Sequence, residues 1–356
     1  MDVSIAAILA QDGITSGAIY ALLALGLVLV FSVTRVILIP QGEFVSYGAL
    51  TLAAIESKTF PATSWLLVVL GCAAFAVEAA THLRARARGA ARPGASGRAL
   101  LTAFARDVLY PFAICGLARV LTRHADLPFW AELALTVLIV VPMGPLIYRL
   151  AFERIAEAST LVLLIVAVAV HFVLVGLGLL MFGAEGSRTA SLTDANLTLG
   201  SLSVSGQSLV VVVAAALLIV ALYLFFGQTL TGKALRATSI NRLGAQLVGI
   251  GTTRAGRIAF TLAAGLGVLS GVLVSPLTTI YYDGGFLIGL KGFVGAIIGG
   301  LVSYPIAAAG ALLVGVLESY SSFWASAYKE VIVFALIVPV LLWRSLATQH
   351  VEEGEE

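Results

Sequence analysis

Residues 160–182 read TLVLLIVAVAVHFVLVGLGLLMF, and residues 208–226 read SLVVVVAAALLIVALYLFF. Each stretch is apolar over about 20 residues, which is the length that an α-helix needs to cross the hydrocarbon core of a bilayer. A helix also satisfies its own backbone hydrogen bonds, as any segment surrounded by lipid must. A transmembrane β-barrel would instead show short segments of alternating polarity. The two stretches therefore predict an all-α, polytopic transmembrane helical bundle.

The rest of the chain extends this pattern. Hydrophobic residues make up 60% of the chain and charged residues 11%, whereas roughly a quarter of the residues in a soluble domain are charged. Counting all the apolar runs predicts about eight to eleven spans. The runs lie at 13–33, 36–56, 64–82, 100–122, 129–148, 160–182, 208–226, 258–280, 287–303, 305–323 and 330–346. For 36–56, which contains Pro40, and for the glycine-rich 287–303, a partly re-entrant path is an alternative.

Basic residues predict the orientation of the bundle. Arginine and lysine gather in an Arg-rich segment at 84–98 and again at 228–257. Cytoplasmic loops carry the excess of Lys and Arg, so both segments are expected in the cytoplasm, and the Gly-, Ser- and Thr-rich connection 183–207 is expected outside. This places the N-terminus outside and the C-terminus in the cytoplasm. We expect one transmembrane domain at 1–346 and an acidic tail at 347–356.

The run at 100–122 departs from the pattern because Arg106 and Asp107 stand in its middle. A charge buried in a membrane span costs several kcal/mol. Either the two side chains pair, or the segment is not fully transmembrane.

The basic segment 228–257 contains a helical pattern, GKALRATSINRLGAQLVGI at 232–250. Ile240, Leu243, Leu247 and Ile250 follow one another at spacings of three and four, which is one face of a helix. Gly249 is expected to help end that helix. Its apolar face would lie either on the membrane surface or in a groove on a soluble partner.

The same segment resembles the coupling segment of branched-chain amino acid ABC permeases of the LivH type, with Gly-x-Ala-x-Arg-Ala, then Asn, then Ala-x-x-x-Gly-Ile. Other stretches match that family in order. They are GITSGAIYALLALGLVL at 13–29, RVI at 35–37 followed by QGEF at 41–44, and the segment from GLKGF at 289–293 to LE at 317–318. The similarity covers about 1–60 and 130–346. LIPQ at 38–41 departs from the family pattern, and 65–128 looks enlarged.

The resemblance implies a permease subunit of an ABC importer in the bacterial inner membrane, passing branched-chain amino acids or related small polar solutes. It implies a homologous second permease or a second copy of this chain, two ABC ATPase subunits and an external solute-binding protein. No Walker-type phosphate loop occurs in the sequence, so ATP and Mg²⁺ are expected in the partner subunits and no cofactor in this chain. Nucleic acid is not an expected partner. The residues expected at the ATPase are Arg236, Ile240, Asn241, Leu243, Leu247 and Gly249.

Gln41, Gly42, Glu43 and Lys291 are the candidates for the transport pathway or for a helix break beside it. Intramembrane ionisable residues usually face a cavity, and broken helices mark transport sites. An alternative for Glu43 is an ion pair with Arg35 at the cytoplasmic interface.

For Lys291 the alternative is a structural pair with Glu318. His171 stands alone in its apolar run and is expected to pack through a hydrogen bond, and no metal site is expected.

Two other classes of protein remain open on the sequence. An ion-coupled transporter or channel would need a fuller set of intramembrane carboxylates or a carbonyl-lined filter. An intramembrane serine hydrolase would need an activated nucleophile, and Ser270 lacks the Gly-x-Ser-x-Gly spacing. We therefore assign no catalytic residue.

Overall fold

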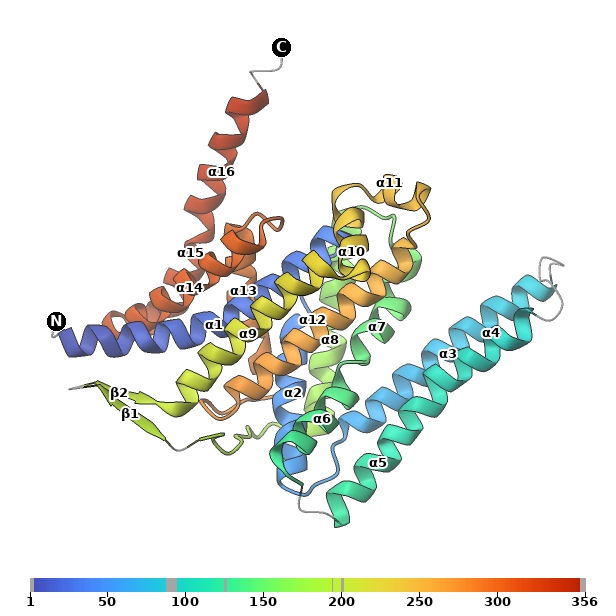
Figure 1. The fold of residues 1–356 in the computed structure, drawn as a ribbon, viewed down its shortest axis with the longest axis horizontal. Helices are drawn as coiled ribbons and strands as arrows, with labels where there is room; N and C mark the ends of the chain where they lie inside the picture. Colours follow the sequence, from blue (N-terminus) through green and yellow to red (C-terminus); the bar gives the residue numbers. More distant parts are fainter. Residues whose placement is uncertain (1–2, 88–94, 125–126, 194, 200–201, 353–356) are drawn as a thin grey trace.

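The computed structural model describes residues 3–87, 95–124, 127–193, 195–199 and 202–352, and most of them are helical (Figure 1). The α-helices are α1 Val3–Thr34, α2 Gln41–Glu56, α3 Thr63–Ala87, α4 Ala95–Phe104, α5 Tyr110–His124, α6 Phe129–Val140, α7 Met143–Ile147, α8 Thr160–Phe182, α9 Gly206–Gln228, α10 Leu230–Ile240, α11 Arg242–Leu247, α12 Thr252–Val274, α13 Gly284–Ile298, α14 Tyr304–Trp324, α15 Lys329–Ala335 and α16 Ile337–Glu352. π-helical turns occupy Ala105–Leu109 and Tyr148–Phe152, and 3₁₀ turns occupy Glu153–Ile155 and Ser326–Tyr328. The strands β1 Asn196–Leu199 and β2 Leu202–Ser205 form an antiparallel hairpin.

The prediction of an all-α bundle is confirmed apart from this β-hairpin, which lies in the connection 183–207. Among the described residues, nine helical segments are long and apolar enough to cross a membrane, within the predicted range. They are Ser4–Thr34, Thr63–Arg84, Leu100–Arg123, Phe129–Ile155, Thr160–Phe182, Gly206–Gln228, Thr252–Val274, Tyr304–Trp324 and Ser326–Trp343. Residues 88–94 of the Arg-rich segment and 353–356 of the acidic tail lie outside the described residues.

The two interrupted apolar runs form the shorter helices α2 and α13, of 16 and 15 residues. Each still carries the chain between the two ends of the bundle. Before α13, Ile280 bridges to Ser187 in the connection that holds the β-hairpin. After α13, the ring of Tyr304 stacks on Phe226 at the end of α9 where α10 begins. We call these the β-hairpin end and the α10–α11 end.

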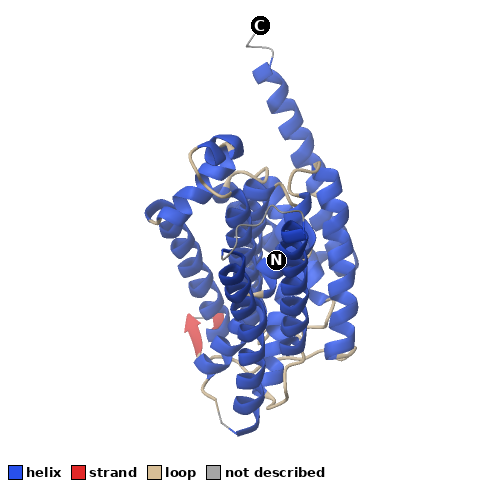
Figure 2. Cartoon of the chain, turned by 90° about the vertical axis from the view of Figure 1, so that its right-hand side faces the viewer, coloured by secondary structure: helices blue, strands red, loops and turns tan. Residues whose placement is uncertain are grey.

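The N-terminus lies near the β-hairpin in the ribbon, and α16 extends past the bundle on the opposite side (Figure 1). A view turned by 90° shows the strands at the end opposite the C-terminus (Figure 2). The start of α1 therefore lies on the β-hairpin side of the molecule, and α16 extends away from it.

Small residues bring the inner helices into backbone contact, as lipid-embedded helices require when no hydrophobic effect drives them together. A Cβ built on Gly315 of α14 would stand 2.4 Å from the backbone oxygen of Gly13 and from Cα of Gly17 in α1. The same closeness recurs where α2 crosses α13, because a Cβ on Gly42 would lie 2.4 Å from the oxygen of Gly285. These glycines therefore pack helices of one chain against one another.

The helices α3, α4 and α5 form a hairpin at one side of the bundle, which we call the arm (Figure 1). The backbone runs through Arg106 and Asp107 without leaving the helix, since a π-helical turn at 105–109 joins α4 to α5. Arg106 Nε donates to Asp107 Oδ1 at 2.7 Å, so the two charges pair. Pairing, the first of the two alternatives for this run, is confirmed.

Candidate functional site

The segment 230–247 forms two helices where the apolar spacing predicted one. Asn241 separates α10 from α11 with extended backbone angles, φ −146° and ψ 102°. Its Oδ1 accepts a hydrogen bond from the amide of Gly244 at 2.8 Å, which is the role of a helix N-cap. The single-helix prediction is therefore wrong at Asn241, because its short polar side chain starts a second helix.

Gly249 ends α11 as predicted. Its φ is 86°, a left-handed conformation that glycine adopts without steric penalty. The amide of Gly249 donates to the oxygen of Gln246 at 3.0 Å, and the amide of Ile250 donates to that of Ala245 at 2.9 Å. This pair of bonds is a Schellman cap, so both α10 and α11 have defined ends.

The apolar side chains of these two helices are left uncovered. Ile240 is 79% exposed, Leu243 68% and Leu247 81%, whereas Ile250, the fourth residue of the predicted face, is partly buried. The pair of helices is nevertheless fixed to the body of the protein, since Arg242 donates to the oxygen of Ala156 at 2.9 Å. A fixed surface of this kind presents apolar groups to whatever lies beyond the α10–α11 end.

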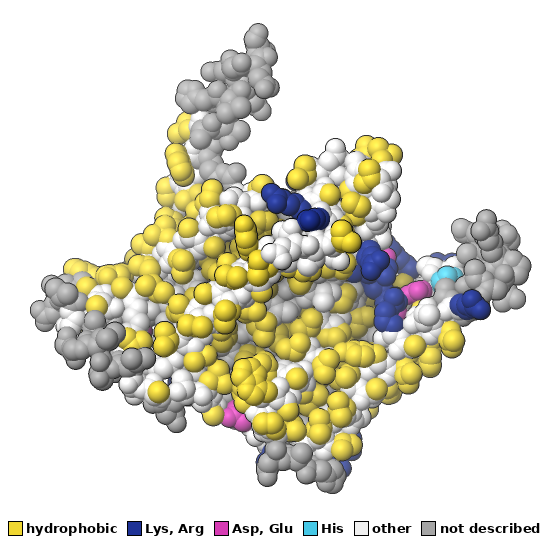
Figure 3. Space-filling model, in the orientation of Figure 1, with side chains coloured by type: hydrophobic (Ala, Val, Ile, Leu, Met, Phe, Trp, Pro, Cys, Tyr) yellow, Lys and Arg dark blue, Asp and Glu magenta, His cyan; other side chains and the backbone are white. Residues whose placement is uncertain are grey.

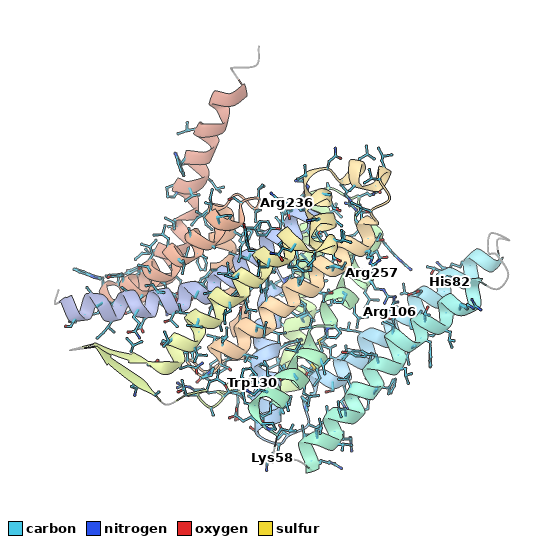
Figure 4. All side chains as sticks on the ribbon, viewed as in Figure 1. Lys58, His82, Arg106, Trp130, Arg236 and Arg257 are labelled. Carbon is cyan, nitrogen blue, oxygen red and sulfur yellow. The ribbon has the colours of Figure 1, made fainter. Side chains whose placement is uncertain are left out.

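Basic side chains also gather at the α10–α11 end. Figure 3 shows Lys and Arg in dark blue there and along the facing side of the arm, on an otherwise mostly apolar surface. Arg236 and Arg257 are labelled near α10 and α12 in Figure 4, while Lys58 lies at the opposite end. Arg257 pairs with Glu153 at 2.6 Å. Arg236 is exposed on α10.

Gln41, Gly42 and Glu43 form the first turn of α2. The chain leaves α1 through Arg35, whose φ of 62° turns the backbone, and does not become helical again until Gln41. Gln41 Nε2 donates to the oxygen of Leu23 in α1 at 3.1 Å. A helix therefore starts inside the bundle at these residues, and all three are buried.

Glu43 pairs with His171 of α8, and the ion pair with Arg35 that we held as an alternative is wrong. Glu43 Oε1 lies 2.7 Å from His171 Nδ1, and Glu43 is 1% exposed. The imidazole also lies against the ring of Phe286 in α13, with centroids 4.5 Å apart. Glu43 Oε2 has no hydrogen-bond partner among the described residues. The pair joins α2, α8 and α13 at one buried point.

Lys291 of α13 stands at the centre of a second buried polar cluster. Its Nζ lies 2.6 Å from Glu318 Oε1 in α14, which confirms the pairing considered in the sequence, and 3.1 Å from Glu330 Oε1 in α15. Tyr20 Oη in α1 donates to Glu318 Oε2 at 2.6 Å. Lys291 is 5% exposed, so it fixes Glu318 from the inner side.

A third cluster holds the arm and was not foreseen as a unit. Arg149 donates to Asp107 Oδ1 at 2.8 Å and also pairs with Glu78, while Arg106 contacts the same Glu78 at 3.0 Å. Asp107 and Arg149 both lie in π-helical turns, which are frequent at functional sites.

A shared signal in the sequence indicates that these residues need partners. A charged or titratable side chain alone in an apolar run must find a partner in another run. Applied to His171 and Glu43, that rule requires a partner for each residue, and the structure shows that they are partners of each other.

The long apolar helices, the buried polar pairs between them and the uncovered helical surface at the basic end together indicate a multi-pass membrane protein. The family described as branched-chain amino acid transport system / permease component matches residues 111–341, and the chain belongs to it. The protein is thus a transport permease component.

Characterised relatives agree over most of the length. The chain is 25% identical to the high-affinity branched-chain amino acid transport system permease protein LivH of Salmonella typhimurium, over 93% of this chain and 91% of that protein. It is 28% identical to the permease protein BraD of the corresponding system of Pseudomonas aeruginosa, over 65% of this chain and 78% of the relative. No solved structure matches the chain.

Proposed function

We propose that this permease carries branched-chain amino acids, or related small polar solutes, through the inner membrane as part of an ABC importer. ATP hydrolysis takes place in two separate ATPase subunits, which bind ATP and Mg²⁺. A homologous permease or a second copy of this chain completes the pathway, and an external solute-binding protein delivers the substrate. The family and the named substrates of LivH and BraD support this proposal.

The uncovered apolar side chains of α10 and α11 carry the proposal of an ATPase partner. Amphipathic helices commonly lay their apolar face in a groove on a partner. Ile240, Leu243 and Leu247 are each 68% exposed or more on helices that are capped and bonded to the body. Arg236, Asn241 and Gly249 belong to the same contact in our proposal, as the adjoining charge, the cap between the helices and the end of α11.

The orientation belongs to the proposal as well. The basic α10–α11 end faces the cytoplasm, in keeping with the excess of Lys and Arg there, and the β-hairpin end faces outside. Ser239→Cys and Asn196→Cys, each in a chain with both native cysteines replaced, test it in intact cells. A membrane-impermeant maleimide should label Asn196→Cys only. Labelling of Ser239→Cys alone would show that the orientation is the opposite of the one proposed.

Leu243→Asp tests the docking role. It places an unpaired charge in the contact, which costs a few kcal/mol, so ATP-driven uptake of leucine by the reconstituted complex should fall at least about tenfold. The ATPase retained on purified permease should fall in parallel. Thr231→Asp is the matched control, since it adds the same charge on an exposed position of α10 on the side away from Ile240.

Full uptake by Leu243→Asp would remove the docking role. If Leu243→Asp instead lowers the amount of inserted protein and leaves uptake per inserted complex unchanged, then the surface lies on lipid.

A further inference from the structure

A polar groove lies between α1 and α14, toward the β-hairpin end. Its volume is about 410 Å³. Its polar lining comes from one face of each helix: Asp12 and Ser16 of α1, and Glu318, Ser319 and Ser322 of α14. Neither the α10–α11 surface nor the Glu43–His171 pair belongs to it.

The polarity of these side chains makes lipid an unfavourable surrounding for them. All five lie within two of the candidate membrane spans, Ser4–Thr34 and Tyr304–Trp324. Hydroxyl and carboxylate groups that face hydrocarbon without partners cost several kcal/mol each. The open side of the groove must therefore meet water or other polar groups in the assembled transporter.

The groove is electronegative. Lys291 Nζ and Tyr20 Oη hold the two oxygens of Glu318 from the inner side, each at 2.6 Å. Lys291 is also shared with Glu330, at 3.1 Å. One ammonium thus serves two carboxylates, and Asp12 adds a third negative charge that has no partner in these interactions.

A carboxylate has room for more hydrogen bonds than Glu318 accepts from Lys291 and Tyr20. Its side chain is 15% exposed, toward the groove. Asp12 and three serine hydroxyls surround the same space. This is an acceptor-rich environment that suits a primary ammonium group.

We propose that the groove is one wall of the substrate pathway and that it binds the ammonium group of a zwitterionic amino acid against Asp12 and Glu318. Leu9 and Phe323 border the groove and offer contact to an aliphatic side chain, while the substrate carboxylate stays on the aqueous side. The identity of the substrate rests on the proposed function. The assignment of the groove to the pathway rests on its polarity inside two spans.

Thiol labelling tests water access to the groove. Cys72 and Cys115, which are the two native cysteines, are replaced by alanine, and Ser319→Cys is introduced into the complete transporter. A cationic, membrane-impermeant methanethiosulfonate should modify it at least about tenfold faster than Leu313→Cys, because thiols in hydrocarbon do not ionise. Leu313 is the matched control on the same helix, 49% exposed and outside the groove. Ser322→Cys serves as the second groove position if Ser319→Cys does not assemble.

Protection by substrate analogues tests the chemistry. Leucine and leucinamide, which both carry the ammonium group, should slow modification of Ser319→Cys. 4-Methylvalerate, which has the same aliphatic chain and no ammonium group, should not. Asp12→Asn should raise the concentration of leucine needed for half protection, and Thr231→Asp should leave it unchanged.

The outcomes separate this inference from the proposed function. Equal labelling of Ser319→Cys and Leu313→Cys would overturn the groove as a pathway wall, even in a transporter that takes up leucine. Protection by 4-methylvalerate equal to that by leucinamide would overturn ammonium recognition. Failure of the wild-type complex to take up leucine would overturn the proposed substrate, whereas fast labelling of the groove with protection by leucinamide would still support the inference.

Discussion

The inner helices and the arm are held to the molecule by different interactions. The inner helices α1, α2, α12, α13 and α14 meet backbone to backbone, through glycines that leave no room for a side chain. The close approach at Gly71, where a Cβ would lie 2.1 Å from the oxygen of Asp107, joins two parts of the arm itself. Arg149 ties the arm to the rest of the molecule through its ion pairs with Asp107 and Glu78, and Arg106 contacts the same two carboxylates from within the arm. Tyr110 of the arm also donates to the oxygen of Leu138 in α6.

The difference separates two kinds of stability. Contacts between two backbones leave no room for an added side chain, because the main chain cannot rotate away as a side chain can. A buried ion cluster tolerates replacement of the whole set but not the loss of one member, since the remaining charge is then unpaired. We therefore expect damage to the inner helices to abolish folding and damage to the cluster to loosen the arm alone.

The largest effect is expected for Gly315→Leu. The new side chain would start 2.4 Å from backbone atoms of both Gly13 and Gly17, so the loss of stability should reach about 3 kcal/mol or more. Detergent extracts should contain almost no monodisperse protein by size-exclusion chromatography. Gly176→Leu is the control, since a Cβ there meets nothing within 4 Å. Normal yield of Gly315→Leu would show that α1 and α14 separate more easily than their packing indicates.

Arg149→Met should have the next largest effect. Asp107 is 1% exposed and would keep Arg106 as its basic partner after it loses Arg149. Because its buried charge is then less well paired, the free energy of unfolding of the arm should fall by about 3 kcal/mol. In a Cys72→Ala background, the buried thiol of Cys115 in α5 should become reactive to a small maleimide while the inner helices stay folded.

A second change supplies the control for that prediction. Asp107→Leu combined with Arg149→Met removes both buried charges and should restore most of the protection of Cys115. Arg154→Met removes a neighbouring exposed charge and should change stability by no more than about 0.5 kcal/mol. If the double variant labels as fast as Arg149→Met, the cluster does not hold the arm by charge pairing.

The smallest effect is expected at Glu43, where the inner helix α2 meets α8. Glu43→Gln keeps an acceptor oxygen for His171 and should lower stability by about 1 kcal/mol. Because Glu43 is 1% exposed, uptake per folded complex should change by less than about twofold. Arg35→Gln, which alters an exposed residue outside the pair, should leave both quantities unchanged. A large loss of uptake per complex in Glu43→Gln would return that carboxylate to the pathway.

The long spans were predictable because length and apolarity alone determine them in a bilayer. The sequence also identified Gly249 as a helix end and the Lys291–Glu318 pair. It missed Asn241 as a helix start, since the apolar spacing of Ile240, Leu243 and Leu247 continues across the break. A periodic pattern shows which side of a helix is apolar, but it does not show where one helix ends and the next begins. That boundary depends on capping residues such as Asn241.

Pairings between distant segments were harder to predict. The sequence offered Arg35 as the partner of Glu43 because Arg35 is near in the chain, whereas the actual partner, His171, is 128 residues away. The cluster at Asp107 depends on π-helical turns that rotate side chains relative to a regular helix, and single-sequence periodicity does not reveal them. The groove between α1 and α14 needs both helices in place before its lining can be recognised.

The glycine contacts also constrain how this protein can evolve. Any replacement of glycine by another amino acid adds at least a Cβ, so the contact of Gly315 with Gly13 and Gly17 leaves no room for even the smallest substitution. Substitutions can accumulate instead on the outward surfaces of α8 and α9, where apolar residues replace one another freely in contact with lipid. We expect divergence among relatives to be concentrated on those outer surfaces, with the crossing points of the inner helices changing last.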